Sequence, residues 1–267
     1  MTTKIKYICT YFLNMRYFIL IFIFATQSSI FAQTGRNSNE LKDSTFTIPM
    51  ITFNYGMDWK AGEISNRFGR NNTVGGSFAI KNKKNWYYGI KGNFNWGGNV
   101  KETSIIDGIK TSDGYVIDNE GRLTYIFLEE RGTSFFLTGG KLFNVLSNNK
   151  NSGVLVYGGI GTLHHKIRIA FKDEIQPLND DYKKGYDRLS FGMATNLFIG
   201  YMHLSKNRFV NFYGGFDLIY GQTKSLRKFN YDTQQADTDY TSNILYGFNV
   251  GWIIRLNKRT KDEYYYD

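Results

Sequence analysis

The sequence predicts an all-β fold, namely an eight-stranded antiparallel transmembrane β-barrel, and three observations support this prediction. Large apolar residues alternate with small or polar ones in eight separate segments, which is typical of strands with one apolar face. The connections between these segments are alternately short and long, as in membrane barrels. No apolar run is long enough for a spanning helix, so strands that cross a bilayer must close on themselves to satisfy their backbone groups.

The first 32 residues have the features of an export signal, and we expect Sec-type export. Positive charge precedes a short apolar core, and the run SSIFAQ offers a cleavage site after Ala32. Translation that starts at Met15 instead of Met1 would give a more ordinary signal length, and the sequence leaves both starts open. The charges are Lys4, Lys6 and Arg16, and the core is YFILIFIFA.

The chain is expected to have four parts, of which the signal peptide is the first. We predict a signal peptide (1–32), a periplasmic N-terminal extension (33–46), the barrel (47–257) and a periplasmic tail (258–267). The tail and the extension are polar and too short to form a second domain.

The composition agrees with alternating strands. Aromatic residues make up 17% of the chain although the mean hydropathy is −0.38, so the apolar residues are interspersed with polar ones. The single cysteine, Cys9, lies in the signal, which predicts neither disulfides nor a thiolate metal site. The net charge of +10 alone would suit a nucleic-acid partner, but export argues against one.

The first three predicted strands alternate strictly, with apolar side chains expected to face lipid and polar ones expected to face the lumen. They are TIPMITFNYGMDW (47–59), TVGGSFAIK (73–81) and WYYGIKGNFNW (86–96).

The two middle strands are less regular. The phase of RGTSFFLTGGKLF (131–143) is ambiguous, and GVLVYGGIGTLHHKIRIAF (153–171) alternates clearly only in its second half. In that half we expect the apolar residues to face lipid and the polar residues to face the lumen. The apolar ones are Leu163, Ile167, Ile169 and Phe171, and the polar ones are His164, Lys166 and Arg168.

The last three strands again alternate clearly, most of all the final one, in which every second residue from Ile244 to Leu256 is large and apolar. All four tryptophans lie near strand ends, as expected for aromatic girdles at the two membrane interfaces. The strands are SFGMATNLFIGYMH (190–203), VNFYGGFDLIYG (210–221) and NILYGFNVGWIIRLN (243–257), and the tryptophans are Trp59, Trp86, Trp96 and Trp252.

Short connections are expected to be periplasmic turns and long ones to be outward loops. A soluble β-sandwich or lipocalin-like barrel is the alternative, but its exterior would then be dominated by Gly, Asn and Thr. The short connections are 81–85, 146–152 and 205–208, and the long ones lie around 60–71, 97–130, 172–188 and 225–240.

Three segments carry a family resemblance. EISNRFGRNNTVGGSF, DYKKGYDRLSFG and NRFVNFYGGFD resemble segments of an uncharacterised small outer-membrane β-barrel family of Bacteroidota. The architecture is similar to that of the eight-stranded OmpA/OmpX-type barrels. The resemblance implies a fold and an outer-membrane location, and it brings no activity and no catalytic residues.

Seven charged residues are expected to face the lumen. A barrel of eight strands is only wide enough for side chains to fill, so we expect ion pairs and hydrogen bonds to seal it. The other interpretation is a narrow anion-preferring pore, because cations outnumber carboxylates in this set. The residues are Asp58, Lys81, Lys91, Lys166, Arg168, Asp217 and Arg255.

One pair of residues suggests catalysis. His203 and Ser205 are two positions apart, so they share the lipid-facing side of one strand, as in outer-membrane lipid A deacylases in which histidine activates a serine. Their place next to a short turn puts them on the periplasmic side, whereas lipid A lies in the outer leaflet. His164 and His165 face opposite sides and do not form a metal site together. The sequence predicts no cofactor and no metal.

The longest outward loop, 97–130, is expected either to bind a partner or to form a cap over the barrel mouth. Ile105, Ile106 and Ile109 are expected to share a face of a short helix, and the rest is expected to form a hairpin or to prolong the fourth strand. We therefore expect a non-enzymatic outer-membrane barrel with a structural, partner-binding or ligand-binding role. The alternatives are a lipid A-modifying hydrolase, a narrow pore, or an accessory barrel of a secretion or assembly machine.

Other expected partners are outer-membrane lipid and lipopolysaccharide around the barrel, and a protein partner at the basic periplasmic turns. The basic residues of these turns are Lys81, Lys83, Lys84, Lys206, Arg208, Lys258, Arg259 and Lys261.

Overall fold

The structure is a computed structural model that describes residues 45–111, 113–117, 119–171, 180–205 and 210–256. All of these belong to one compact unit, Leu41–Asp267. The signal peptide, most of the N-terminal extension and the tail lie outside the described residues, and their assignments stay predictions. The same holds for the basic residues at 206, 208, 258, 259 and 261.

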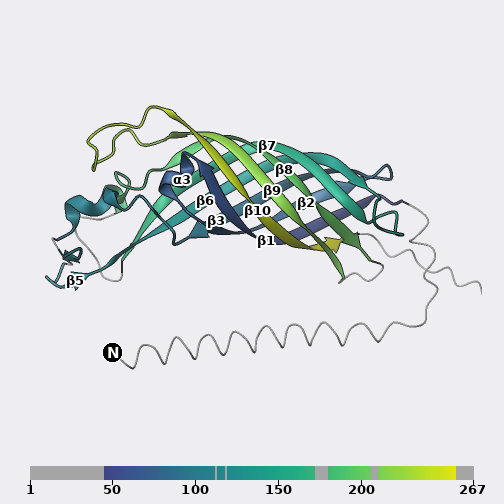
Figure 1. The fold of residues 1–267 in the computed structure, drawn as a ribbon, viewed down its shortest axis with the longest axis horizontal. Coiled ribbons are helices and arrows are strands. Elements are labelled where there is room, and N and C mark those ends of the chain that lie inside the picture. Colours follow the sequence, from purple (N-terminus) through teal and green to yellow (C-terminus); the bar gives the residue numbers. More distant parts are fainter. Residues whose placement is uncertain (1–44, 112, 118, 172–179, 206–209, 257–267) are drawn as a thin grey trace, which may run out of the picture. The chain divides into compact units, whose positions relative to one another are not determined.

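Eight antiparallel strands form a closed barrel, which confirms the predicted fold class (Figure 1). Each strand pairs with the next strand of the barrel along the chain, and β1 closes the ring against β10, with Met50 opposite Arg255 and Gly62 opposite Asn243. The strands are β1 (Ile48–Gly62), β2 (Asn71–Lys81), β3 (Trp86–Gly97), β6 (Ile126–Phe143), β7 (Gly153–Phe171), β8 (Ser190–Leu204), β9 (Asn211–Ser225) and β10 (Tyr240–Arg255).

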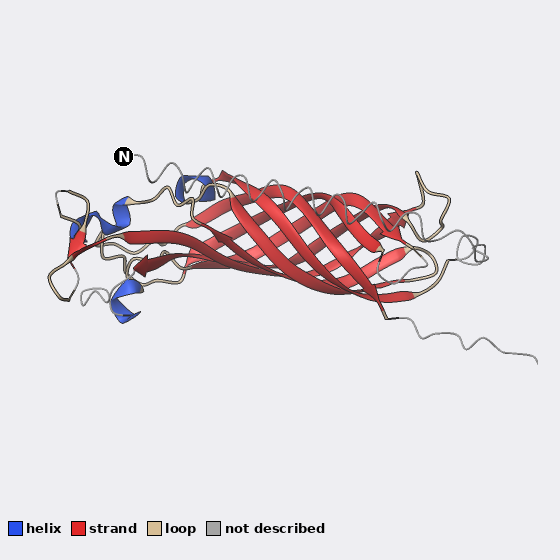
Figure 2. Cartoon of the chain, turned by 90° about the horizontal axis from the view of Figure 1, so that it is seen from below, coloured by secondary structure: helices blue, strands red, loops and turns tan. Residues whose placement is uncertain are grey.

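The remaining elements gather at one end of the barrel, which we call the long-loop end; the other is the short-turn end (Figure 2). They are α3 (Ile64–Arg67), the 3-10 helix η1 (Ser104–Ile109), the hairpin β4 (Val116–Ile117) and β5 (Leu123–Thr124), and α4 (Asp180–Lys183). Both the short helix and the hairpin predicted for the longest loop are thereby confirmed. Among the described residues, no helix has the length and apolar character needed to cross a membrane.

The barrel turns its apolar side chains outward and its polar ones inward, as the alternation predicts. On β1, Phe53 and Tyr55 are exposed while Thr52 and Asn54 are buried. Glycine makes room for large inward side chains: a Cβ on Gly251 would collide with the ring of Tyr213. Large apolar side chains exposed on the barrel wall include Val74, Phe78, Ile90, Phe94, Leu137, Ile160, Met193, Leu197, Ile199, Phe212, Phe216, Phe248 and Val250.

The structure resolves the ambiguous phase of β6. Phe135 points outward and is 63% exposed, whereas Ser134 and Phe136 are buried in the lumen. With 18 and 19 residues, β6 and β7 are the longest strands, and their pairing continues to Ile126 opposite Phe171. Because the neighbouring strands stop earlier, at Gly97 and Ser190, these two strands extend beyond the barrel at the long-loop end.

The predicted phase of the second half of β7 is wrong. Leu163, Ile167 and Ile169 are buried inside, while Lys166 is half-buried and Arg168 is exposed on the outer face. The physical reason is the extension of β7 beyond its neighbouring strands: the outer face of this part carries polar side chains, and its inner face packs into an apolar cluster.

Two apolar clusters lie inside the barrel, together with buried polar side chains. The cluster near the short-turn end surrounds a cavity of about 10 Å³, which has room for roughly one water molecule. It consists of Ile48, Met50, Ala79, Tyr87, Leu142, Leu155, Tyr157, Phe198, Met202, Leu204, Tyr213 and Ile253. The cluster near the long-loop end, described below, closes the other mouth.

Candidate functional site

An ion pair crosses the middle of the lumen. The ammonium of Lys91 on β3 binds the carboxylate of Asp217 on β9, and the two side chains are 3% and 5% exposed. The Lys91 ammonium also donates to the Tyr157 hydroxyl at 3.2 Å, and the Asn196 amide donates to Asp217. Since β3 and β9 lie four strands apart in either direction around the ring, this pair connects opposite walls of the barrel.

A second buried ion pair, which the sequence did not reveal, lies nearer the long-loop end. Lys60 on β1 binds Glu130 on β6 at 2.8 Å, and the side chains are 1% and 2% exposed. The Asn71 amide donates to the same carboxylate at 3.3 Å. Glu130 falls at the end of the segment expected to be a loop, and the phase of β6 was ambiguous, so the alternation did not predict that this residue faces the lumen.

The other predicted lumen charges have different positions. Asp58 is buried and accepts a hydrogen bond from the Thr73 hydroxyl. Lys81 is buried at the short-turn end, where its ammonium donates to Asn85 at 2.8 Å, so it is not an exposed residue of a basic turn. Arg255 is half-buried on the inward phase of β10. Among the seven residues predicted to face the lumen, Lys91 and Asp217 are the two that form a described ion pair with each other.

Lys166 and Arg168 do not belong to the lumen. They lie on the outer face of β7, opposite Arg131 and Glu129 of β6. The guanidinium of Arg168 binds the Glu129 carboxylate at 3.2 Å on this outer surface. The prediction fails here because it assumed a lipid-facing apolar side along the whole strand.

An apolar plug closes the long-loop end of the barrel. It is built from three loop elements that fold into the mouth: α3 and the residue Phe68 that follows it, η1, and the hairpin strand β4. Ile105 and Ile106 are 0% and 2% exposed, and Ile109 packs against them partly buried, as the shared helical face predicts. The plug consists of Ile64, Phe68, Ile105, Ile106, Val116, Phe136, Leu163, Ile167, Ile169, Ala194, Ile219 and Leu245.

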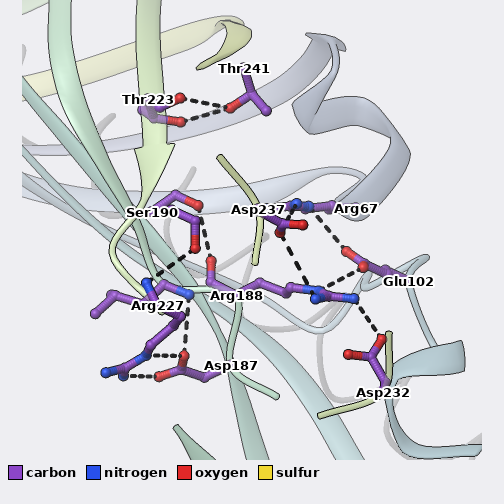
Figure 3. Close-up of polar contacts among 12 residues, drawn as sticks. Arg67, Glu102, Asp187, Arg188, Ser190, Thr223, Arg227, Asp232, Asp237 and Thr241 are labelled. Atoms are coloured by element: carbon purple, nitrogen blue, oxygen red, sulfur yellow. Dashed lines mark hydrogen bonds and ion pairs between the residues drawn. The ribbon is translucent and has the colours of Figure 1, made fainter. Parts of the chain in front are cut away.

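An ionic network centred on Arg188 lies among the loops (Figure 3). The Arg188 guanidinium, 5% exposed, contacts Glu102 at 3.0 Å, Asp232 at 2.6 Å and Asp237 at 3.9 Å. Arg67 binds two of the same carboxylates, Glu102 at 3.1 Å and Asp237 at 3.4 Å. These five residues come from all four long connections of the barrel, so the network ties the four loops together.

A third guanidinium, that of Arg227, holds the base of the fourth loop. Its Nε and Nη2 atoms donate to the two oxygens of Asp187 at 2.8 and 2.6 Å, as Figure 3 shows. These hydrogen bonds raise the pKa of the Arg227 guanidinium above its usual value. The Asp187 carbonyl in turn accepts a hydrogen bond at 2.7 Å from the backbone N–H of Ile167 on β7. The third and fourth loops are thus fixed to the extension of β7.

The two catalytic candidates, His203 and Ser205, have different neighbours among the described residues. The ring of His203 lies 5.1 Å from that of Phe212, whereas the Ser205 backbone N–H donates to Asn211 at 2.8 Å. His165 faces the lumen, where its Nε2 atom lies 3.3 Å from the Thr223 hydroxyl, and His164 faces outward. Among the described residues, no group of three or more His, Cys, Asp or Glu side chains could hold a metal ion.

Solved structures of small outer-membrane barrels are similar to this chain. Ail, the attachment invasion locus protein of Yersinia pestis, in complex with the heparin analogue sucrose octasulfate, is 13% identical over 79% of this chain and 100% of its own, with a TM-score of 0.38. A second structure of Ail is 13% identical over 79% of this chain and 99% of its own, with a TM-score of 0.37. The N-terminal β-barrel domain of Pseudomonas aeruginosa OprF is 12% identical over 79% of this chain and 100% of its own, with a TM-score of 0.34.

No protein-family model matches the chain, and no curated protein matches it. The fold assignment therefore rests on the strand pairing described above, and the resemblance to a barrel family of Bacteroidota stays a prediction from the sequence.

Proposed function

We propose that this protein is an integral outer-membrane barrel that binds a partner or ligand through its outward loops, without catalysis and without conduction. One observation carries the proposal: Arg188 and Arg67 join all four long loops through Glu102, Asp232 and Asp237. Loops that merely close a barrel need no shared network, because short connections suffice. Loops held together in one arrangement form a preorganised surface, and preorganisation lowers the entropy cost of binding.

The location is inferred from the predicted export signal together with the apolar outer wall of the barrel. Residues such as Phe248 and Ile160 are 63% exposed, and a protein in water would bury side chains of this size. In this orientation the short turns lie in the periplasm, the long loops lie outside, and outer-membrane lipid and lipopolysaccharide surround the wall.

Exposed apolar groups on the loops support a binding role. Ile117, Leu123, Tyr125 and Phe127, on or next to the β4–β5 hairpin, are 52–61% exposed and lie beyond the barrel, where no lipid covers them. Exposed apolar patches outside the membrane are typical of interaction surfaces. The bulk of the same loop caps the barrel, because Ile105, Ile106 and Val116 are part of the plug, so one loop serves both purposes.

Co-purification from native membranes tests the proposal. Residues 99–121 are replaced by a short Gly/Ser linker, and the native complex is compared with that of the unaltered protein. The replacement leaves the lipid-facing strands untouched, so we expect an inserted barrel with heat-modifiable gel mobility that has lost its associated component. The matched control changes Lys83→Gln and Lys84→Gln on an exposed short turn. If the complex stays intact after loop replacement and is lost in the Lys83→Gln and Lys84→Gln variant, the binding site lies at the basic periplasmic turns.

The pore alternative is tested by conductance in planar bilayers. The plug, the two buried ion pairs and a cavity of only about 10 Å³ near the short-turn end support a lumen that is closed to ions. We expect the unaltered protein to give no steady current steps. A stable anion-selective conductance would contradict the proposal and support the narrow pore.

A further inference from the structure

A concave basic pocket lies on the outside of the barrel, against the extension of β7. Its volume is about 490 Å³, and its walls come from β7, α4 with the residue after it, and the start of the fourth loop. The residues that line it are Lys166, Ile167, Arg168, Ile169, Ala170, Phe171, Lys183, Lys184, Asp187 and Arg227.

The charge of the pocket is strongly unbalanced. Among its described lining residues, five side chains are cationic and one, Asp187, is a carboxylate that already accepts both hydrogen bonds of Arg227. Glu129 binds Arg168 from the neighbouring strand, so the cations still outnumber these two carboxylates. The Lys183 ammonium lies 4.4 Å from the centre of the Phe171 ring, which holds it over the pocket wall. A concave site with surplus positive charge favours an anion, and phosphate oxygens are good acceptors for arginine and lysine donors.

The height of the pocket identifies the source of the anion. The outer face of β7 is apolar at Val154, Val156 and Ile160, and it becomes cationic at Lys166 and Arg168. At about 3.3 Å per residue and a tilt of about 40°, Lys166 lies roughly 30 Å above Val154, just beyond an apolar band about 25 Å tall. This is the level of the lipid headgroups.

We propose that this pocket binds a phosphate group of an outer-leaflet lipid headgroup, with Lys166 and Arg168 as the principal contacts. Arg227 stays paired with Asp187 and supplies part of the wall, and Lys183 and Lys184 also line the pocket. This inference rests on the proposed outer-membrane position of the barrel and names one ligand class for it.

Native mass spectrometry of the full-length, detergent-solubilised protein tests the inference. The probe is bis-phosphorylated lipid A, and the comparison lipid has the same acyl chains without phosphates. We expect at least about tenfold weaker binding of the lipid that lacks phosphates, since charge-assisted hydrogen bonds supply the difference. The double variant Lys166→Gln and Arg168→Gln should lose a similar factor, whereas Lys83→Gln with Lys84→Gln, at the opposite end of the barrel, should bind as the unaltered protein does.

Folding is measured separately by heat-modifiable gel mobility of each variant from membranes. A protein that is not inserted and not heat-modifiable refutes the proposed function itself. An inserted protein that binds both lipids equally, or whose double variant binds normally, overturns only the pocket. Inorganic phosphate and a heparin fragment are the remaining arms: if either binds as tightly as lipid A and displaces it, the site recognises a soluble anion and the lipid assignment is wrong.

Discussion

Lys91 and Asp217 form an ion pair between opposite walls of the barrel, and both side chains are almost completely buried. The pair fixes the distance between β3 and β9 at the middle of the lumen. Removing one partner leaves a buried charge without compensation, which costs much more than removing both.

We therefore expect Asp217→Ala to lower the free energy of unfolding by about 3–5 kcal/mol, measured by urea titration in lipid vesicles. The double variant Lys91→Met with Asp217→Leu should recover most of this loss, because no unpaired charge remains. As a control, Glu120→Gln removes a carboxylate from an exposed pair with Arg122 and should change the stability by less than about 1 kcal/mol. Equal losses in the single and double variants would show that the buried charges are not coupled.

The outer wall can be tested with two side chains of nearly equal exposure. Phe248 on β10 is 63% exposed and Leu123 on the hairpin is 61% exposed, but only the first is expected to face lipid. Phe248→Arg should lower the folding free energy in vesicles by about 2–4 kcal/mol if it lies near the bilayer midplane. Leu123→Arg should have a much smaller effect, because its side chain stays in water. If the two substitutions cost the same, the wall does not face lipid.

The network among the loops predicts a local effect of Arg188. Arg188→Ala removes contacts to three carboxylates and should raise the rate of protease cleavage within the loops of the inserted protein by about tenfold or more. The barrel itself should keep its heat-modifiable mobility. Arg188→Lys retains the charge but loses the fork of donors, so an intermediate rate is expected. Unchanged cleavage in both variants would mean that the loops are held by the plug alone.

The hydrolase alternative predicts a chemical change in lipid A. We expect His203→Ala and Ser205→Ala to leave its acylation pattern unchanged, because the ring of His203 packs near Phe212 and the Ser205 backbone is bound to Asn211. Mass spectrometry of lipid A from cells with and without the gene is the measurement. An acyl chain whose removal depends on both residues would establish the enzyme.

The strands were predictable because apolar and polar residues alternate along them, so that every second side chain lies on the outer wall. The rule failed on β7, where Ile167 and Ile169 face inward, since this part of the strand extends beyond its neighbours and packs on the plug. Lys91 and Asp217 were predicted to face the lumen, but their pairing depends on register across the ring, which alternation does not specify.

The loop network could not be predicted for a different reason. Arg67 and Asp237 are 170 positions apart in the chain and lie in loops without periodicity. Their contact follows only once the barrel has closed and has brought the first and last loops together. The same closure explains why Glu130 and Lys60 were missed, since neither has a partner nearby in sequence.

The hairpin tip around Gly121 offers a practical consequence of this arrangement. Gly121 has open space around it, whereas Asp232 and Asp237 are held by Arg188 and Arg67. A peptide tag inserted at the tip should be displayed on the cell surface without disturbing its neighbours. The fourth loop, by contrast, cannot be replaced independently of the other loops. A replacement that lacks Asp232 or Asp237 also removes the ion pairs with Arg188 and Arg67, which hold two other loops in place.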